Sequence, residues 1–274
     1  MAKTERRDSI SDIAEYYSKS EEHNRLSLQQ LEFAVTKRLL AKYLKPSSRI
    51  LELGAGSGRY TLELAKNGHD VIAVEVVPSL VEQGRKYVSE NGATAQYIES
   101  DARDFKTGVS GLFDAALIMG PLYHLISSHD RTDLVRDVTT VVKPGGLVIS
   151  VHLTRVGVMS YMLARFPAWG LEAPDQIKNL MSTGHLPDHP RNGEFRGYFS
   201  SLKEIENLYS NNGLEIVRLH SQDPCIGALD EVYNRLPDDI KEAWADALTD
   251  ISHDPLALGS GRGIICVSRV PSGK

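Results

Sequence analysis

The sequence has little of what marks several large classes of protein. It has two cysteines, Cys225 and Cys266, far apart and in no metal-binding spacing, so we expect neither a disulfide framework nor a zinc site. No run of ~18 apolar residues is present for a membrane span, and the first residues lack the apolar core of a signal peptide. We therefore expect a cytoplasmic protein that does not enter a membrane.

Clustered positive charge is also missing. The formal net charge is −5, and the one short basic stretch, 3–7, is interrupted by Glu5. Nucleic-acid-binding proteins usually carry a basic patch, so we expect no nucleic-acid partner. Hydrophobic residues make up 41% and charged residues 24% of the 274 residues, a balance that supports a large globular core. Because elaborated α/β domains reach this length, a single domain over 1–274 is the simplest interpretation.

Apolar segments with the character of strands alternate with helical patterns along the chain. Seven strands are predicted, at 49–53, 70–76, 94–100, 113–119, 147–153, 214–221 and 263–270. Helices are predicted at 26–44, 58–67, 78–91 and 129–142, and another opens at Ser200 or Ser201. This alternation predicts an α/β fold with a doubly wound, mostly parallel seven-stranded sheet. The sequence Lys143-Pro144-Gly145-Gly146 predicts a turn before the fifth strand.

Two segments interrupt this rhythm and are predicted to be helical cap insertions. They cover 155–199, where no clear strand is visible, and 223–261. The core then comprises 46–154, 200–222 and 262–270, preceded by an N-terminal helical cap at 1–45. Insertions late in a doubly wound chain are placed to cover a ligand site at the edge of the sheet.

Three alternate glycines, Gly54, Gly56 and Gly58, stand directly after the first predicted strand and before a helix. Glycine lets a backbone turn tightly and approach a ligand, and the following helix directs free amide groups toward it. The second strand closes with Glu75, 21 residues beyond Gly54, where an acidic side chain can accept hydrogen bonds from ribose hydroxyls. Together these features indicate a cofactor that contains adenosine.

The spacing of the glycines narrows the choice of cofactor. A dinucleotide fingerprint has glycine at its sixth position, but Arg59 stands there, which argues against a nicotinamide-dependent oxidoreductase. With Glu52 two residues before the first glycine, ELGAGSG resembles the first motif of class I, Rossmann-like methyltransferases that depend on S-adenosylmethionine. The acidic residue after YIES, the segment MGPLYHL and the KPGG turn also resemble that family.

The resemblance implies S-adenosylmethionine as the cofactor and assigns roles to particular residues. In the family, an acidic residue after the third strand lies near the adenine, and an N-terminal helix closes over the cofactor with an aromatic and sometimes a basic residue. Tyr17 is a further candidate for that aromatic residue. The cofactor-binding residues implied are Tyr16, Arg25, Glu52, Gly54, Ala55, Gly56, Gly58, Glu75, Val76, Asp101, Ala102, Met119 and Gly120.

Methyl transfer from a sulfonium mainly requires alignment of the nucleophile, methyl carbon and sulfur. By analogy with the family, the methyl acceptor should lie beside Tyr123 and His124, which follow the fourth strand. His124 either takes a proton from the nucleophile or packs as a structural residue. His152 has the same two interpretations. His185 and His189 flank Asp188, but the prolines around them argue against a metal site.

These features favour an enzyme that methylates a small molecule. Capped apolar pockets suit compact substrates, and the insertions carry the aromatic residues Phe166, Trp169, Phe195, Tyr198, Tyr233 and Trp244. A protein or peptide methyltransferase and a non-catalytic cofactor-binding subunit are the alternatives, since fold does not dictate function. We expect a monomer or a homodimer.

Overall fold

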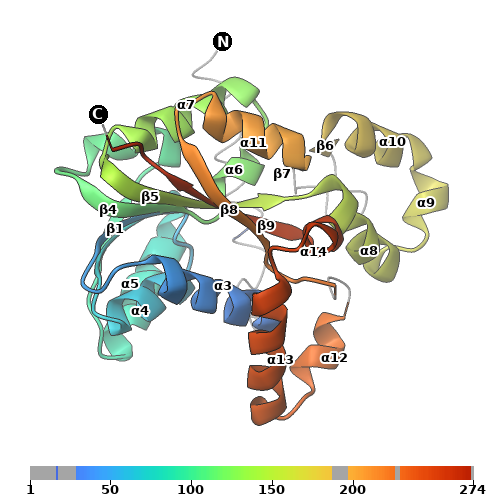
Figure 1. Cartoon of the computed structure of the whole chain (residues 1–274), viewed down its shortest axis with the longest axis horizontal. Coiled ribbons are helices and arrows are strands. Elements are labelled where there is room, and N and C mark those ends of the chain that lie inside the picture. The colour runs from blue at the N-terminus through green and yellow to red at the C-terminus, as the bar shows by residue number, and fades with distance from the viewer. Residues whose placement is uncertain (1–16, 18–28, 187–196, 226–228, 273–274) are drawn as a thin grey trace.

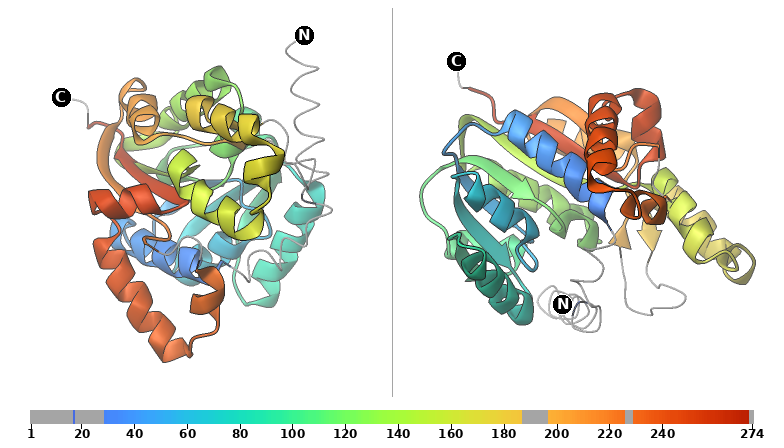
Figure 2. Two further views of the ribbon diagram at one scale, coloured as in Figure 1. Left: turned by 90° about the vertical axis from the view of Figure 1, so that its right-hand side faces the viewer. Right: turned by 90° about the horizontal axis from the view of Figure 1, so that it is seen from below.

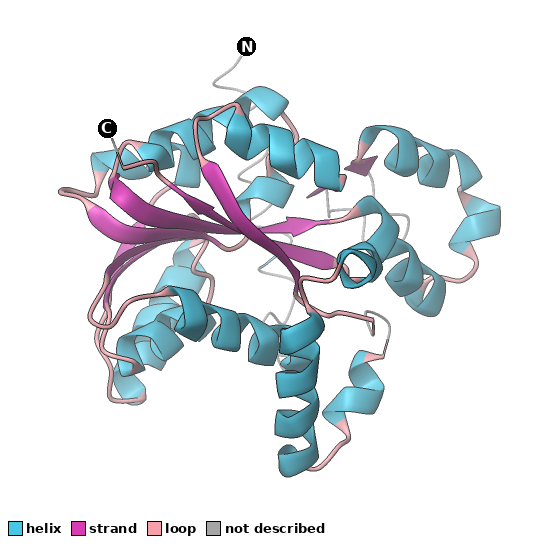
Figure 3. Cartoon of the chain, viewed as in Figure 1, coloured by secondary structure: helices cyan, strands magenta, loops and turns pink. Residues whose placement is uncertain are grey.

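The computed structural model describes residues 17, 29–186, 197–225 and 229–272. Seven strands form one sheet in the order β3-β2-β1-β4-β5-β9-β8 (Figures 1 and 3). All pairs are parallel except those made by β9, which runs antiparallel to both of its neighbours. The strands are β1 (Arg49–Leu53), β2 (Asp70–Glu75), β3 (Gln96–Glu99), β4 (Phe113–Ile118), β5 (Val142–Leu153), β8 (Glu215–Ser221) and β9 (Gly263–Arg269). The predicted doubly wound, mostly parallel sheet is confirmed.

Helices cover both faces of this sheet, as Figure 1 shows. On one face lie α3 (Gln30–Tyr43), α4 (Arg59–Lys66) and α5 (Pro78–Glu90), and on the other α7 (Ser128–Thr139) and α11 (Leu202–Ser210). Central strands are therefore apolar on both sides, as in β1, where Ile50, Leu51 and Leu53 are all fully buried. The short helices η1 (Ala102–Thr107) and α6 (Pro121–His124) follow β3 and β4.

The start of α11 is set by a capping box. The Ser201 hydroxyl accepts a hydrogen bond from the Glu204 amide, and the Glu204 carboxylate accepts one from the Ser201 amide at 2.7 Å. Two otherwise unpaired helix amides are satisfied in this way. The predicted opening of this helix is thus confirmed at Ser201.

The KPGG segment does not leave the sheet, so the predicted separate turn is wrong. β5 already begins at Val142, and its register with β4 shifts between Phe113 and Ala115. Gly145 has φ +77°, and a Cβ on Gly146 would lie 2.8 Å from the Asp114 carbonyl oxygen. The glycines therefore allow a bulge inside the strand, a local feature that sequence pattern does not distinguish from a turn.

The first insertion forms a small cap with its own core. It contains α8 (Arg155–Arg165), α9 (Trp169–Glu172), α10 (Pro174–Thr183), β6 (His185–Leu186) and β7 (Gly197–Tyr198). Apolar residues from these elements, including Trp169 and Leu180, bury one another. The prediction that 155–199 contains no clear strand is wrong, because β6 and β7 lie in this segment and pair antiparallel. Strands of two residues are too short to show a period in the sequence.

The second insertion lies mainly beside α3. It forms α12 (Asp230–Asn234), α13 (Asp238–Ile251) and α14 (Pro255–Ser260), and α13 packs against α3 (Figure 2). Arg38 of α3 pairs with Glu242 and Asp246 of α13, each at 2.6 Å. This part of the insertion therefore widens one helical layer. None of the helices in the described part of the chain combines the length and apolar character that a bilayer crossing requires.

Candidate active site

A cavity of about 320 Å³ opens at the carboxyl ends of the central parallel strands, where ligands bind in open α/β sheets. One half is polar and is formed by the loop after β1, the end of β2 and the chain after β3. The other half is largely apolar, with Val151 and Leu153 of β5 facing Val158 and Met162 of α8. The segment 119–125 after β4 contributes to the wall as well.

Backbone conformation, steric crowding and exposure to the cavity account for the three glycines of the loop. Gly54, Gly56 and Gly58 all have positive φ, at +77°, +54° and +92°, a region that costs other residues roughly 1–2 kcal/mol. A Cβ on Gly54 would meet Pro121 Cδ at 2.5 Å, and one on Gly58 would meet the Tyr97 hydroxyl at 2.5 Å. A Cβ on Gly56 would have no described heavy atom within 4 Å. Gly56 lines the cavity, so its backbone is open to a ligand.

Glu75 holds this loop in place. Its Oε2 accepts a hydrogen bond from the Gly56 amide at 2.8 Å, and its Oε1 accepts from the amides of Val76 and Val77 at 2.9 and 3.0 Å. The side chain also lines the cavity. Glu75 therefore joins the tip of the loop to the end of β2, a structural role that sequence spacing did not indicate.

Glu52 lies behind the loop and is not among the residues that line the cavity. It is fully buried, and its Oε2 accepts a hydrogen bond from the Thr61 hydroxyl at 2.7 Å. Its Oε1 has no hydrogen-bond partner among the described residues. Burial, reinforced by the charge of Glu75, raises the pKa of Glu52 to about 8, so the carboxyl is mostly protonated at pH 7.

Asp101 lies in the cavity wall as part of a partly buried ion cluster. Its carboxylate caps η1 by accepting from the Arg103 amide at 2.8 Å, and it pairs with the Arg103 guanidinium at 2.6 Å. Arg103 also pairs with Asp130 of α7 at 2.8 Å. The cluster fixes the chain after β3 to the opposite helical layer. Asp130 is distant in sequence, so only the fold reveals it.

Three aromatic side chains meet where α6 borders the cavity. The Tyr17 hydroxyl lies 2.9 Å from His124 Nε2, and the rings of Tyr123 and His124 have centroids 4.7 Å apart. All three residues line the cavity, as do Met119 and Gly120. An N-terminal aromatic residue thus does reach the site, through Tyr17. Tyr16 and Arg25 lie outside the described residues.

His152 is structural, so the interpretation of it as a base is wrong. It is 2% exposed, and its Nε2 lies 3.0 Å from the Tyr209 hydroxyl and 3.1 Å from the Ser150 hydroxyl. Burial, together with the charge of Arg131, lowers the pKa of His152 to about 3. Side chains alternate along a strand, so its neighbours Val151 and Leu153 face the cavity instead.

Within the described residues, the first insertion contributes no histidine to the cavity lining. His185 lies in β6, where its ring packs edge-on against Tyr198 with centroids 5.4 Å apart. His189 and Asp188 lie outside the described residues.

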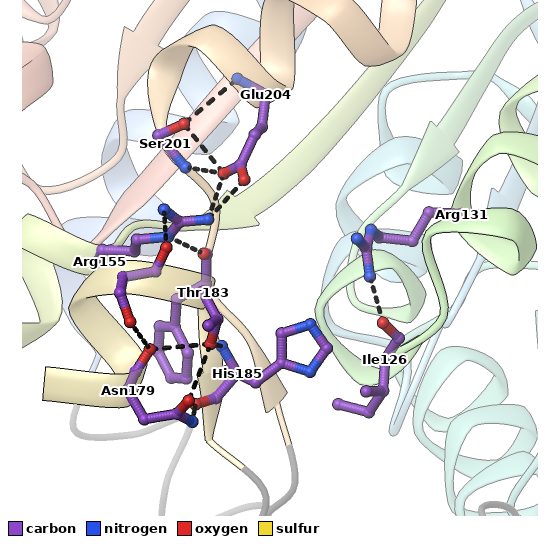
Figure 4. Close-up of polar contacts among 10 residues, drawn as sticks. Ile126, Arg131, Arg155, Asn179, Thr183, His185, Ser201 and Glu204 are labelled. Carbon is purple, nitrogen blue, oxygen red and sulfur yellow. Dashed lines mark hydrogen bonds and ion pairs between the residues drawn. The ribbon is translucent and has the colours of Figure 1, made fainter. Parts of the chain in front are cut away.

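Two arginines fasten the cap to the core beside the site (Figure 4). Arg155 donates from Nε to the Phe199 carbonyl at 3.0 Å and pairs with Glu204 of α11 at 2.5 Å. Arg131 donates from Nη1 to the carbonyls of Leu125 and Ile126 at 2.6 and 2.8 Å, and stacks 3.4 Å over the Tyr198 ring. Arg131 thereby ties the chain that follows His124 to β7 of the cap.

Comparison with known proteins agrees with this geometry. Residues 50–146 match the family model described as a methyltransferase domain. The chain contains a methyltransferase domain. A ubiquinone biosynthesis O-methyltransferase from Xanthomonas axonopodis pv. citri is 31% identical to this chain over 113 residues, which is 41% of this chain and 46% of that protein. The chain thus spans about half the length of the curated relatives it matches.

The similarity of fold to solved structures extends beyond residues 50–146. A SAM-dependent methyltransferase from Methanosarcina mazei superposes with a TM-score of 0.59 at 18% identity, covering 86% of this chain and 98% of that one. Magnesium protoporphyrin IX methyltransferase from Synechocystis, solved with bound SAH, superposes with a TM-score of 0.54 at 14% identity, covering 89% and 84%. The fold is therefore that of class I methyltransferases over most of the chain.

Of the aromatic residues expected around a capped pocket, Phe166 alone among those described lines the cavity. Trp169 and Tyr198 are buried within the cap, and Tyr233 packs in the core cluster that includes α3. Trp244 is 54% exposed on α13, and Phe195 lies outside the described residues. The apolar wall comes instead from residues that composition did not single out, such as Tyr161, Met162 and Phe199.

The raised pKa of Glu52 predicts that the free energy of unfolding depends on pH. The folded protein keeps the proton up to about pH 8, whereas the unfolded chain releases it near pH 4.5. The contribution is therefore present at low pH and is lost as the pH rises through the folded pKa. Between pH 6.5 and 8, we expect the contribution of Glu52 to the free energy of unfolding to fall by on the order of 1 kcal/mol per pH unit.

Urea unfolding of the wild type and of Glu52→Gln would measure this slope, which the amide should remove. The lowered pKa values of His69, His152 and His220 act in the opposite direction around and below their ordinary value of 6.5. Both proteins carry these histidines, so the difference between their slopes isolates Glu52. Equal slopes in the two proteins would contradict a buried neutral carboxyl.

Proposed function

We propose that this chain is an S-adenosylmethionine-dependent methyltransferase that transfers a methyl group to a nucleophilic O, N, S or C atom of a small molecule. The observation that carries the proposal is the open backbone of Gly56, flanked by the carboxylates of Glu75 and Asp101 in one cavity wall. Such a wall suits a nucleoside, with amides for polar groups and acids for ribose and adenine. The methyltransferase-domain match over 50–146 supports the same choice.

We assign each part of the cofactor to a stretch of the cavity lining. We place the amino acid part against Gly54, Ala55 and Gly56, and the ribose at Glu75 and Val76. The adenine then lies beside Asp101 and Ala102, and the sulfur lies toward Met119 and Gly120. All of these residues line the cavity. Glu52 and Gly58 support the loop from outside this lining, so we assign them an indirect role.

When bound, S-adenosylmethionine supplies an electrophilic methyl carbon on a positively charged sulfur. The protein then has to hold the nucleophile in line with that carbon, which is the role we assign to Tyr123 and the apolar wall. A nucleophile that carries a proton must also lose it, and the His124 imidazole can accept that proton at Nδ1 while its Nε2 shares a hydrogen bond with the Tyr17 hydroxyl. The Tyr17 hydroxyl orients the imidazole ring through the same hydrogen bond.

The apolar side-chain lining of the acceptor half favours a small molecule over a protein or peptide. Its wall is formed by the side chains of α8 and by Phe199, which is 2% exposed and held through its carbonyl by Arg155. Compact apolar molecules fit such cavities, whereas a peptide chain needs an open groove. Arg59 at the sixth position of the dinucleotide fingerprint, where its third glycine would stand, disfavours a nicotinamide cofactor.

Isothermal titration calorimetry with S-adenosylmethionine, S-adenosylhomocysteine and NADH tests the choice of cofactor directly. We expect both adenosyl sulfur compounds to bind and NADH to show no comparable affinity. Binding of NADH in the absence of S-adenosylmethionine binding would defeat the proposal.

Gly56→Val should weaken S-adenosylhomocysteine binding by at least tenfold, because the side chain would enter open space at the cavity wall. Gly68→Val is the matched control, since Gly68 also has positive φ and open space around it but lies outside the cavity lining. Both variants should lose roughly 1–2 kcal/mol of stability from backbone strain. Calorimetry and urea unfolding separate the two effects. Equal affinity in the two variants would place the cofactor elsewhere.

His124→Ala should lower turnover by about 10²–10⁴-fold if the imidazole accepts the proton, and it should leave S-adenosylhomocysteine affinity nearly unchanged. The exposed residue His129 on α7 provides the control His129→Ala, which should have wild-type turnover. The measurement is S-adenosylhomocysteine formation with a panel of phenols, amines and thiols. Wild-type turnover in His124→Ala would reduce the mechanism to alignment alone.

A further inference from the structure

A buried guanidinium forms part of the wall in the acceptor half of the cavity. Arg262 directly precedes β9, is 8% exposed and lines the cavity together with Gly263. Its guanidinium lies 5.3 Å from the centre of the Tyr161 ring on α8. The neighbouring wall residues Val158 and Met162 are apolar. A charged group in such a place demands an explanation, because burying a charge is costly unless it is paired and hydrogen-bonded.

Two buried aspartates hold Arg262 in one orientation. Asp223 accepts from the Arg262 amide at 2.8 Å through Oδ1 and from Nε at 2.6 Å through Oδ2. Asp230 lies 3.0 Å from Nη1 through Oδ2 and accepts from Nη2 at 3.1 Å through Oδ1. Asp223 is 1% and Asp230 7% exposed. The guanidinium plane is therefore fixed by contacts on two of its edges.

These contacts leave part of the guanidinium unused. A guanidinium has five N–H donors, and the two carboxylates accept hydrogen bonds from two of them, one on Nε and one on Nη2, while Nη1 forms an ion pair with Asp230. The remaining N–H groups on Nη1 and Nη2 have no hydrogen-bond partner among the residues that the structure describes. An unmade hydrogen bond in a buried place costs roughly 1–3 kcal/mol. A bound molecule with an acceptor atom would remove that penalty.

The charge of the cluster restricts what that molecule can be. Asp223 and Asp230 together carry one more negative charge than Arg262 neutralises, and all three are buried, where charges interact more strongly than in water. A carboxylate or phosphate on the ligand would meet this excess negative charge. An ammonium could not accept from the remaining N–H donors. A neutral oxygen atom satisfies both conditions.

We propose that Arg262 recognises the methyl acceptor, and that the acceptor is a neutral, largely apolar molecule with a carbonyl-type oxygen bonded to this guanidinium. Its body would lie against Tyr161 and Met162, and its nucleophilic atom would lie toward His124. This inference rests on the proposed methyltransferase function, because it names the substrate class of the same cavity.

Four phenols of similar size test the inference by calorimetry on the protein loaded with S-adenosylhomocysteine. They are para-hydroxyacetophenone with a neutral carbonyl, para-ethylphenol with no second polar group, para-hydroxybenzoate with a carboxylate, and tyramine with an ammonium. We expect para-hydroxyacetophenone to bind about tenfold more tightly than para-ethylphenol, the gain of about one buried hydrogen bond. We expect para-hydroxybenzoate to bind most weakly.

Two variants and a control assign the preference to the cluster. Arg262→Met should abolish the preference for para-hydroxyacetophenone over para-ethylphenol. Asp230→Asn keeps the guanidinium but removes the excess charge, so the affinity for para-hydroxybenzoate should rise by about tenfold relative to wild type. Arg136→Met, which changes an exposed arginine on α7 outside the cavity lining, should leave all four affinities unchanged. Asp230→Asn keeps the test decisive if Arg262→Met does not fold.

The outcomes separate this inference from the function on which it rests. Failure of the wild type to bind S-adenosylhomocysteine would overturn the proposed function itself. If S-adenosylhomocysteine binds, the inference is overturned by tightest binding of the anion or the cation, by no binding of any phenol, or by an unchanged preference in Arg262→Met. An Asp230→Asn variant with unaltered selectivity would equally overturn it.

Discussion

The turn between β1 and α4 has left-handed backbone at three glycines, and two of them have no room for a Cβ. Pro121 of α6 and Tyr97 of β3 approach two of these glycines so closely that any side chain would collide with them. The third glycine, Gly56, is held by a hydrogen bond to the Glu75 carboxylate. Three neighbouring strands and α6 therefore converge on this turn, and the geometry of the polar half of the cavity depends on it.

Arginines placed between carbonyls, rings and carboxylates shape the rest of the cavity. Arg103 lies between Asp101 and Asp130, and Arg262 lies between Asp223 and Asp230, so each cluster has one carboxylate in excess. In the polar half of the cavity, the excess of negative charge favours a positively charged ligand, such as the sulfonium of the proposed cofactor. Arg131 and Arg155 instead bind backbone carbonyls and fix the cap over the acceptor half. Rigid walls of this kind hold reacting groups in line.

Glu52 shows how one residue can match a family motif and still lie outside the ligand site. The side chain of β1 that precedes the loop faces the interior, where Thr61 alone among the described residues donates a hydrogen bond to it. A neutral carboxyl there avoids placing a second negative charge close to Glu75. Motif position identified the right segment of the chain, while the direction of the side chain set its role.

The order of the seven core strands, the glycine turn, the strand-end positions of Glu75 and Asp101 and the place of His124 after β4 could all be predicted from the sequence. These follow from local rules, because period, glycine spacing and strand termini depend on neighbouring residues and parallel strands bring their carboxyl ends together. The folded structure was needed to show that His152 is buried, that Trp244 lies outside the cavity, and that Arg262 lies in its wall. Burial and partners of a side chain depend on segments far away in the sequence. No local pattern carries that information.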